Sequence, residues 1–125
     1  MNPKIAVAVS DVFFSARIRE TAAQLGVPTI FVGKAEQVLE VVEREDPCLL
    51  IIDLNDARFD AVETVRAIKG SARVPSTRIL GFLSHVQAEL AESARGAGCD
   101  QVMARSRFTQ LLPQLLRDAI VTPRA

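Results

Sequence analysis

The chain has 125 residues, about the length of one domain, and its 49% hydrophobic and 24% charged residues are typical of a globular protein. A chain of this size buries about two-thirds of its unfolded surface, so it can hold a core without metal or disulfides. Fifteen basic residues balance fifteen acidic ones, which argues against a general affinity for nucleic acid or for an anionic membrane surface.

The sequence also indicates a compartment. No leader is visible before the first expected strand, and no apolar run approaches the ~20 residues of a membrane span. Cys48 and Cys99 lack the spacing of metal ligands, and we expect both to be small buried residues in a reducing compartment. These features predict a cytoplasmic protein.

Five short apolar runs, rich in β-branched residues, alternate with longer amphipathic segments. Such runs are typical of strands that are covered on both faces. In chain order, strands are predicted at residues 5–9, 29–32, 48–52, 78–83 and 101–104.

The segments after these strands carry apolar residues at helical spacing and predict five helices. The expected buried faces hold, in turn, Ile18, Ala22 and Leu25; Val38, Val41 and Val42; Val62, Val65 and Ile68; Val86, Leu90, Ala94 and Ala97; and Phe108, Leu111, Leu112, Leu115, Leu116 and Ala119. The first four helices are expected to end near Gly26, Asp46, Gly70 and Gly98.

The last apolar stripe contains a proline, Pro113. Proline is tolerated in the first turn of a helix, so we expect this helix to begin near Thr109 or Gln110. Residues 1–121 are predicted to form a single domain, and residues 122–125 a C-terminal tail.

Strict alternation of strands and helices with short connections predicts an α/β fold, a (βα)5 doubly wound five-stranded parallel sheet. Such sheets carry their sites beyond the carboxyl ends of the strands. The candidate site residues are therefore those that follow the strands: Ser10, Asp11, Asp53, Leu54, Asn55, Ser84, His85 and Arg105.

Residues 4–120 resemble the receiver domain of bacterial response regulators. Leu-Leu-Ile-Ile-Asp-Leu-Asn at 49–55 is similar to the family's third strand, and the resemblance makes Asp53 the equivalent of the phosphoacceptor. Ser84 matches the hydroxyl residue that contacts the phosphoryl group, and Arg105 stands at the position of the family's lysine. The resemblance implies a flavodoxin-like architecture with strand order 2-1-3-4-5.

The first strand departs from the family. Receivers end this strand with two adjacent acidic residues that hold magnesium, and those positions fall on Val9 and Ser10, with Asp11 next. The possible ligands are then Asp11, Asp53 and the main-chain carbonyl of Asn55. Because Mg²⁺ prefers several oxygen ligands in near-octahedral geometry, we expect magnesium binding to be possible but weak, or absent.

Several of these side chains also have purely structural interpretations. Asp11 would cap the first helix, and Ser84 the fourth. Arg105 could form a forked pair with Asp53 or contact a phosphoryl oxygen, and the sequence does not choose between these roles.

The leading functional prediction is a two-component-type signalling module that binds partner proteins, a histidine kinase or a downstream regulator, without contacting nucleic acid and without enzyme activity. The missing acidic pair, and Val102 in place of the family's usual aromatic residue, favour an atypical receiver over a conventional one switched by phosphorylation of Asp53. The expected partner face combines the fourth helix, fifth strand and fifth helix, with Gln87, Arg95, Gln101, Met103 and Arg107.

A small flavodoxin-like ligand-binding or enzyme domain is the rival class. It would need a phosphate loop rich in glycine and hydroxyl groups after the first strand. Residues 10–15 are not such a loop, and we expect Phe13 and Phe14 within them to be packing residues. A third possibility is that the chain is the receiver part of a longer regulator.

Overall fold

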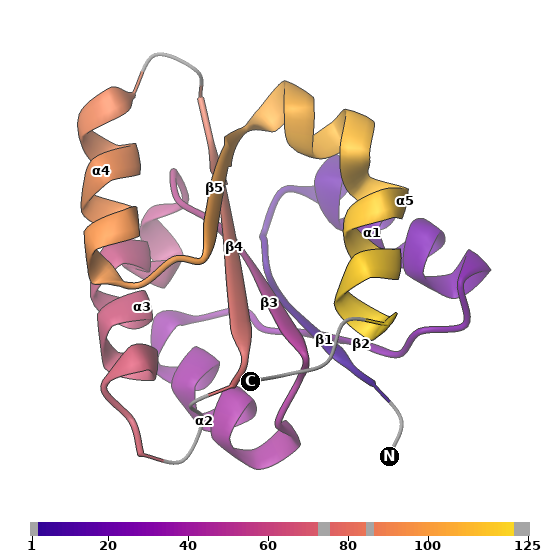
Figure 1. Cartoon of the computed structure of the whole chain (residues 1–125), viewed down its shortest axis with the longest axis horizontal. Coiled ribbons are helices and arrows are strands. Elements are labelled where there is room, and N and C mark those ends of the chain that lie inside the picture. The colour runs from indigo at the N-terminus through magenta and orange to yellow at the C-terminus, as the bar shows by residue number, and fades with distance from the viewer. Residues whose placement is uncertain (1–2, 73–75, 85–86, 122–125) are drawn as a thin grey trace.

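The five predicted strands form one parallel sheet with the order β2-β1-β3-β4-β5 (Figure 1). The structure, a computed structural model, describes residues 3–72, 76–84 and 87–121. The strands are β1 (Ile5–Ala8), β2 (Thr29–Phe31), β3 (Leu49–Asp53), β4 (Arg78–Leu83) and β5 (Gln101–Ala104). The predicted α/β class, the doubly wound winding and the strand order are confirmed.

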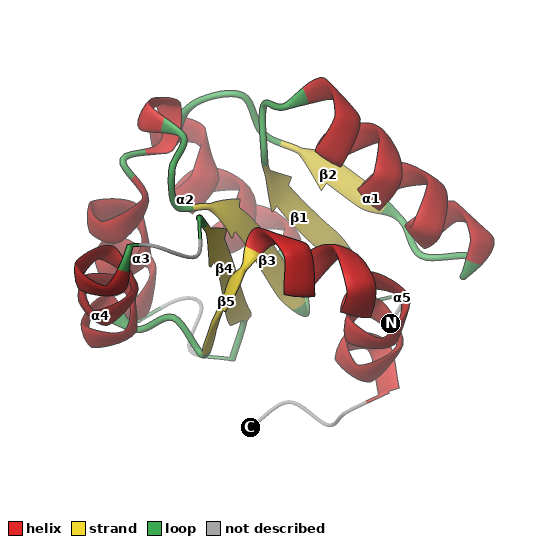
Figure 2. Cartoon of the chain, turned by 90° about the horizontal axis from the view of Figure 1, so that it is seen from above, coloured by secondary structure: helices red, strands yellow, loops and turns green. Residues whose placement is uncertain are grey.

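The helices cover the two faces of the sheet. They are α1 (Val12–Gln24), α2 (Ala35–Glu45), α3 (Ala61–Lys69), α4 (Ala88–Ala97) and α5 (Arg105–Val121), with a short 3₁₀ helix η1 (Ala57–Phe59) before α3. Helices α1 and α5 lie on one face, and α2, α3 and α4 lie on the other (Figures 1 and 2).

Alternation along each strand divides the core into two halves. In β1, Ile5 and Val7 pack toward α1 and α5, whereas Ala6 and Ala8 pack toward α2 and α3. All four side chains are fully buried, which explains why the run is continuously apolar rather than alternating.

The predicted helix ends are confirmed. Helix α2 stops at Asp46, which takes a left-handed conformation (φ 48°), and Gly26 and Gly98 carry positive φ beyond α1 and α4. Gly98 also lies against the side chain of Lys69, where a Cβ atom would be 2.4 Å from the lysine Cγ. The backbone conformation and the close neighbour both require glycine at this position.

The prediction for the last helix was wrong. Helix α5 begins at Arg105, directly after β5, so Pro113 lies in its interior rather than in its first turn. Proline has no N–H to donate to the carbonyl four residues earlier, and its ring crowds that carbonyl. The helix changes direction along its length, a bend that we attribute to Pro113 (Figures 1 and 2).

Other details differ little from expectation. Strand β3 ends on Asp53 itself, and both cysteines are buried and are not joined by a disulfide. Val86 and His85 lie outside the described residues, as does the predicted tail at 122–125, so the boundary after residue 121 stays a prediction. None of the helices among the described residues is long and apolar enough to cross a membrane.

Candidate functional site

Asp53 occupies the carboxyl end of the central strand. It pairs with Phe82 of β4, and β1 borders β3 on the other side. The residue is 5% exposed, and its Oδ1 accepts a hydrogen bond of 2.9 Å from the Asn55 N–H. The fold therefore places one nearly buried carboxylate at the edge of the sheet where doubly wound proteins carry their sites.

The environment of Asp53 disfavours its charged form. Burial raises the pKa of the carboxyl group above its usual value, against the lowering effects of the Asn55 N–H and the Arg105 guanidinium. The negative charges of Asp56 and Asp11 raise the pKa further. A raised pKa is typical of carboxyl groups at functional sites, although structural burial also produces it.

Arg105 supplies the cation of the site. Its Nη2 lies 3.8 Å from Asp53 Oδ2, which is an ion pair but too long for a hydrogen bond. The forked pair, one of the two roles considered for Arg105, is therefore not formed. The guanidinium instead lies over aromatic rings, 5.0 Å from the centroid of Phe14 and 5.8 Å from that of Phe82, within the range of cation–π attraction.

These rings belong to a triangular cluster of three aromatic residues. Phe82 stacks on Phe14 at a centroid distance of 5.4 Å and on Phe108 at 4.6 Å, and the Phe14 and Phe108 centroids are 6.5 Å apart. The expectation that Phe14 packs at the mouth of the site is confirmed. The same expectation for Phe13 was wrong, because its side chain is 86% exposed. Phe14, the next residue on α1, faces the other aromatic rings, whereas the Phe13 side chain points away from the core.

A further carboxylate, Asp56, joins the site and was not recognised in the sequence. Ser10 Oγ donates a hydrogen bond to Asp56 Oδ2, and Asp56 Oδ1 accepts the N–H of Arg58 at the start of η1. Ser10 and Asp56 are 46 residues apart and meet only because β1 and β3 are neighbours. In the sequence alone, an acidic residue three positions after Asp53 does not indicate a site residue, because the pairing of β1 with β3 is not visible there.

The expected magnesium ligands do not converge in this arrangement. Asp11 caps α1, accepting the Phe14 N–H at 3.0 Å, and Asp56 is bonded to Ser10 and to the η1 backbone. Among the residues that the structure describes, no three acidic, histidine or cysteine side chains form a group that could hold a metal ion. The donor set present therefore does not fit a magnesium ion, which needs several free oxygen ligands.

Asn55 ties the loop after β3 to the loop after β4. Its Oδ1 accepts the Ser84 N–H at 2.9 Å, and its Nδ2 donates to Gln87 Oε1 at 2.5 Å. Ser84 does not cap α4, whose N-cap residue is Gln87 and which has no side-chain cap bond. The Ser84 side chain is exposed at the same edge as Asp53, and its position depends on this Asn55 bridge.

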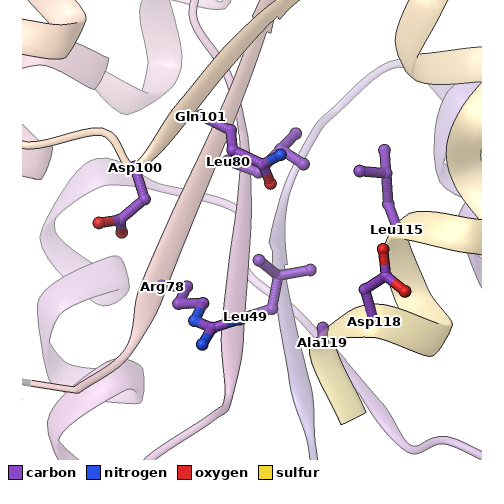
Figure 3. A pocket seen from close by; sticks show the side chains of 8 residues that line it. All are labelled: Leu49, Arg78, Leu80, Asp100, Gln101, Leu115, Asp118 and Ala119. Atoms are coloured by element: carbon purple, nitrogen blue, oxygen red, sulfur yellow. The ribbon is translucent and has the colours of Figure 1, made fainter. Parts of the chain in front are cut away.

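A cavity of about 310 Å³ lies at the opposite end of the sheet, between the first residues of β3, β4 and β5 and the second half of α5. Figure 3 shows the side chains that line it, among them Leu49, Arg78 and Asp118. The side chains of Asp53 and Arg105 are not part of it. Asp53 and Arg105 thus lie at the carboxyl end of the sheet, away from this cavity.

Comparison with known proteins agrees with this fold. No family model matches the chain. The transcriptional activator protein ExaE of Pseudomonas putida is 27% identical over 92 residues, which cover 74% of this chain and 42% of that protein. The chain thus spans less than half of the curated relative that it matches.

Solved structures are similar over nearly the whole chain. A response regulator from Hahella chejuensis has a TM-score of 0.86 at 17% identity and covers 97% of each chain. The receiver domain of a sensor histidine kinase from Pseudomonas aeruginosa PAO1, solved with magnesium in its active-site cleft, has a TM-score of 0.81 at 17% identity and covers 96% of this chain and 98% of its own. The chemotaxis response regulator CheY4 of Vibrio cholerae has a TM-score of 0.81 at 14% identity, with 95% and 99% covered.

The chain is a doubly wound α/β protein of the flavodoxin-like type. More narrowly, its fold is that of response-regulator receiver domains, as the sequence resemblance implied.

Proposed function

We propose that the chain is a receiver-like signalling module of a two-component-type phosphorelay, with weakened or absent magnesium-dependent phosphorylation at Asp53. It acts in the cytoplasm as one domain, residues 1–121, by binding a histidine kinase or a downstream regulator, and it has no enzyme activity of its own. The supporting observation is the environment of Asp53, which combines Arg105 and Ser84 at the same edge with a β1 end that supplies no acidic pair.

Phosphoryl transfer to a carboxylate is mainly a problem of charge and position, because both reactants are anionic. In this chain Val9 and Ser10 stand where the receiver family carries acidic residues, and Asp11 and Asp56 are already bonded to backbone N–H groups. Arg105 is the cation beside Asp53. Its single charge offsets less of the repulsion between the carboxylate and the incoming phosphoryl group than a divalent ion would. Slow phosphorylation follows from this arrangement.

A conventional phospho-accepting receiver is the second candidate, and one observation favours it. The charges of Asp56 and Asp11 both act on Asp53, so three carboxylates share this edge rather than the two expected. Release of Asp56 from Ser10 would free an oxygen ligand close to the position of the missing acidic pair. This version predicts magnesium binding after a local rearrangement.

The partner surface of the proposal is the face of α4, β5 and α5. Strand β5 is the outer strand of the sheet, and Gln101 at its start is exposed. The named relative is a transcriptional activator, which supports a downstream partner in gene regulation. An output of that kind is carried either by the rest of a longer regulator or by a separate protein.

Acetyl phosphate with magnesium, followed by intact-mass measurement, tests the proposal. The atypical version predicts little or no single phosphoryl adduct over times that fully modify a conventional receiver treated in parallel. The Asp53→Asn variant is the matched control, since it preserves size and removes the acceptor. Rapid, complete modification that is lost in Asp53→Asn would establish the conventional version, and an adduct retained in Asp53→Asn would reject Asp53 as acceptor.

A further inference from the structure

A cavity lies at the carboxyl edge of the sheet, with Arg105 among its walls. It measures about 710 Å³, and its walls include Phe14 from α1, Ser84 after β4, and Arg105, Thr109 and Gln110 from α5. We call it the mouth cavity. Its volume lies within the range of about 300–1,000 Å³ that is usual for small-molecule sites.

A smaller lobe of about 170 Å³ continues the mouth cavity along α1. Phe14 and Thr109 line both spaces, and Phe13 and Arg17 complete the lobe. Among the described residues, no acidic side chain lines either space, whereas Arg105 lines one and Arg17 the other. The charge of the walls therefore favours an anionic ligand.

The aromatic wall favours a ligand with a flat apolar body. The Phe14 ring is fixed from behind by its stacking on Phe82 at 5.4 Å, so it offers a pre-oriented surface. Aromatic groups gain from offset stacking beyond the area that they bury. The exposed ring of Phe13 extends the same apolar surface into the smaller lobe.

Arg105 has unused hydrogen-bonding capacity. Its Nε is buried and has no hydrogen-bond partner among the described residues, and its Nη2 is 3.8 Å from Asp53. Buried donors in folded proteins are almost always satisfied, and an anionic acceptor is the strongest partner for a guanidinium. The side chain as a whole is 40% exposed, so a ligand carboxylate beside Arg105 would bond its terminal nitrogens without displacing a hydrogen bond to Asp53.

We propose that the mouth cavity binds a small aromatic anion, with its ring on Phe14 and its anionic group on Arg105. The inference goes beyond the proposed function, because it requires no phosphoryl transfer. Binding would draw the Arg105 charge away from Asp53, so the ligand and the Asp53 carboxylate compete for one cation. A small molecule would then act on this module at the point where a phosphoryl group acts on a conventional receiver.

The test is a titration of ¹⁵N-labelled protein with 1-naphthoate, without phosphodonor or magnesium. Saturable shifts at the amides of Phe14, Arg105 and Thr109 are expected, with a dissociation constant of roughly 1 mM for one charged contact and one stacked ring. The neutral analogue 1-naphthamide should bind more weakly, by about tenfold or by a larger factor. No saturable shift, shifts centred elsewhere, or equal affinity for the amide would each overturn the proposal.

Point variants test whether naphthoate binds in the mouth cavity. Arg105→Gln should weaken naphthoate binding about tenfold, the value of a charge-assisted hydrogen bond. Gln110→Glu, an isosteric change at an exposed wall residue, should weaken it several-fold by charge repulsion. Gln114→Glu makes the same change on the same helix outside both spaces and should leave the affinity unchanged. Equal effects of the two glutamate variants would reject the site.

Asp53→Asn separates this inference from the proposed function. The variant cannot accept a phosphoryl group, but it releases Arg105 from its charged neighbour, so naphthoate should bind several-fold more tightly than to the wild type. A looser complex in Asp53→Asn would contradict the competition. Retained naphthoate binding alongside a failed phosphorylation assay would leave the inference standing without the phosphorelay.

Discussion

Replacing Gly81 by alanine should destabilise the protein through a single neighbour, Leu54. A Cβ atom at Gly81 would lie 2.9 Å from each of three Leu54 side-chain carbons, closer than carbon atoms pack. Leu54 cannot easily move, because its N–H donates to the Phe82 carbonyl at 2.9 Å and its side chain is buried. Overpacking of this kind costs about 1–3 kcal/mol.

The assay is urea unfolding followed by far-ultraviolet circular dichroism. A loss of about 2 kcal/mol lowers the midpoint by roughly 1 M. Gly96→Ala is the matched control, because Gly96 is an exposed residue inside α4 with open space around a new Cβ. The same substitution should there stabilise the protein by about 0.5–1 kcal/mol, through helix propensity.

A double-mutant cycle identifies the neighbour. Leu54→Ala alone should cost about 2–5 kcal/mol by leaving a cavity, and adding Gly81→Ala should cost little more, since the new methyl group then has room. The two losses should therefore fall short of additivity by about 1–3 kcal/mol. Additivity within ~0.5 kcal/mol, or an unchanged midpoint in Gly81→Ala, would refute the account of this contact.

Three further predictions concern the site and one turn. The pKa of Asp53 is raised in the folded protein, so the free energy of unfolding falls as the pH rises from the unfolded-state pKa of about 3.9 through the folded-state pKa. Asp53→Asn should therefore be more stable than the wild type at neutral pH, and the difference in stability should disappear in acid. Denaturant titrations across pH measure this difference. Ser10→Asp places a carboxylate beside Asp56 and should raise magnesium affinity about tenfold by calorimetry while costing about 1 kcal/mol without metal; unchanged magnesium affinity would count against the proposed cause of weak phosphorylation. Gly98→Ala should cost about 1–3 kcal/mol in thermal or urea unfolding, since φ is 126° and Lys69 blocks the new methyl group; a neutral result would mean that the turn relaxes.

The fold was largely predictable because local signals agreed with one another. Strands β4 and β5 have the predicted bounds, and the glycine and aspartate residues after α1 to α4 end those helices as expected. The error at α5 arose where local rules conflict with packing. Phe108 before Pro113 and Leu116 after it are both fully buried, and their burial outweighs the hydrogen bond lost at Pro113.

The site was less predictable, because its contacts depend on tertiary pairing. Asp53 was found from its position after an apolar run, and the cap at Asp11 from its position before a helix. The link between Ser10 and Asp56 and the bridge from Asn55 to Ser84 connect segments tens of residues apart, so sequence spacing carries no sign of them. Their geometry follows only once the parallel register is fixed.

We expect the bend in α5 to divide the helix into two units that open separately. The carbonyl of Thr109 cannot accept the usual helical hydrogen bond, because the residue four positions later is Pro113. The first unit carries Arg105 and Phe108, and the second carries Leu116, which is fully buried. Amide exchange in the first turn, at residues 105–107, should then proceed by local fraying, whereas Phe108 and the second half should exchange through global unfolding. Opening of this first turn would move Arg105 away from Asp53 while Phe108 and Leu116 stay in the core.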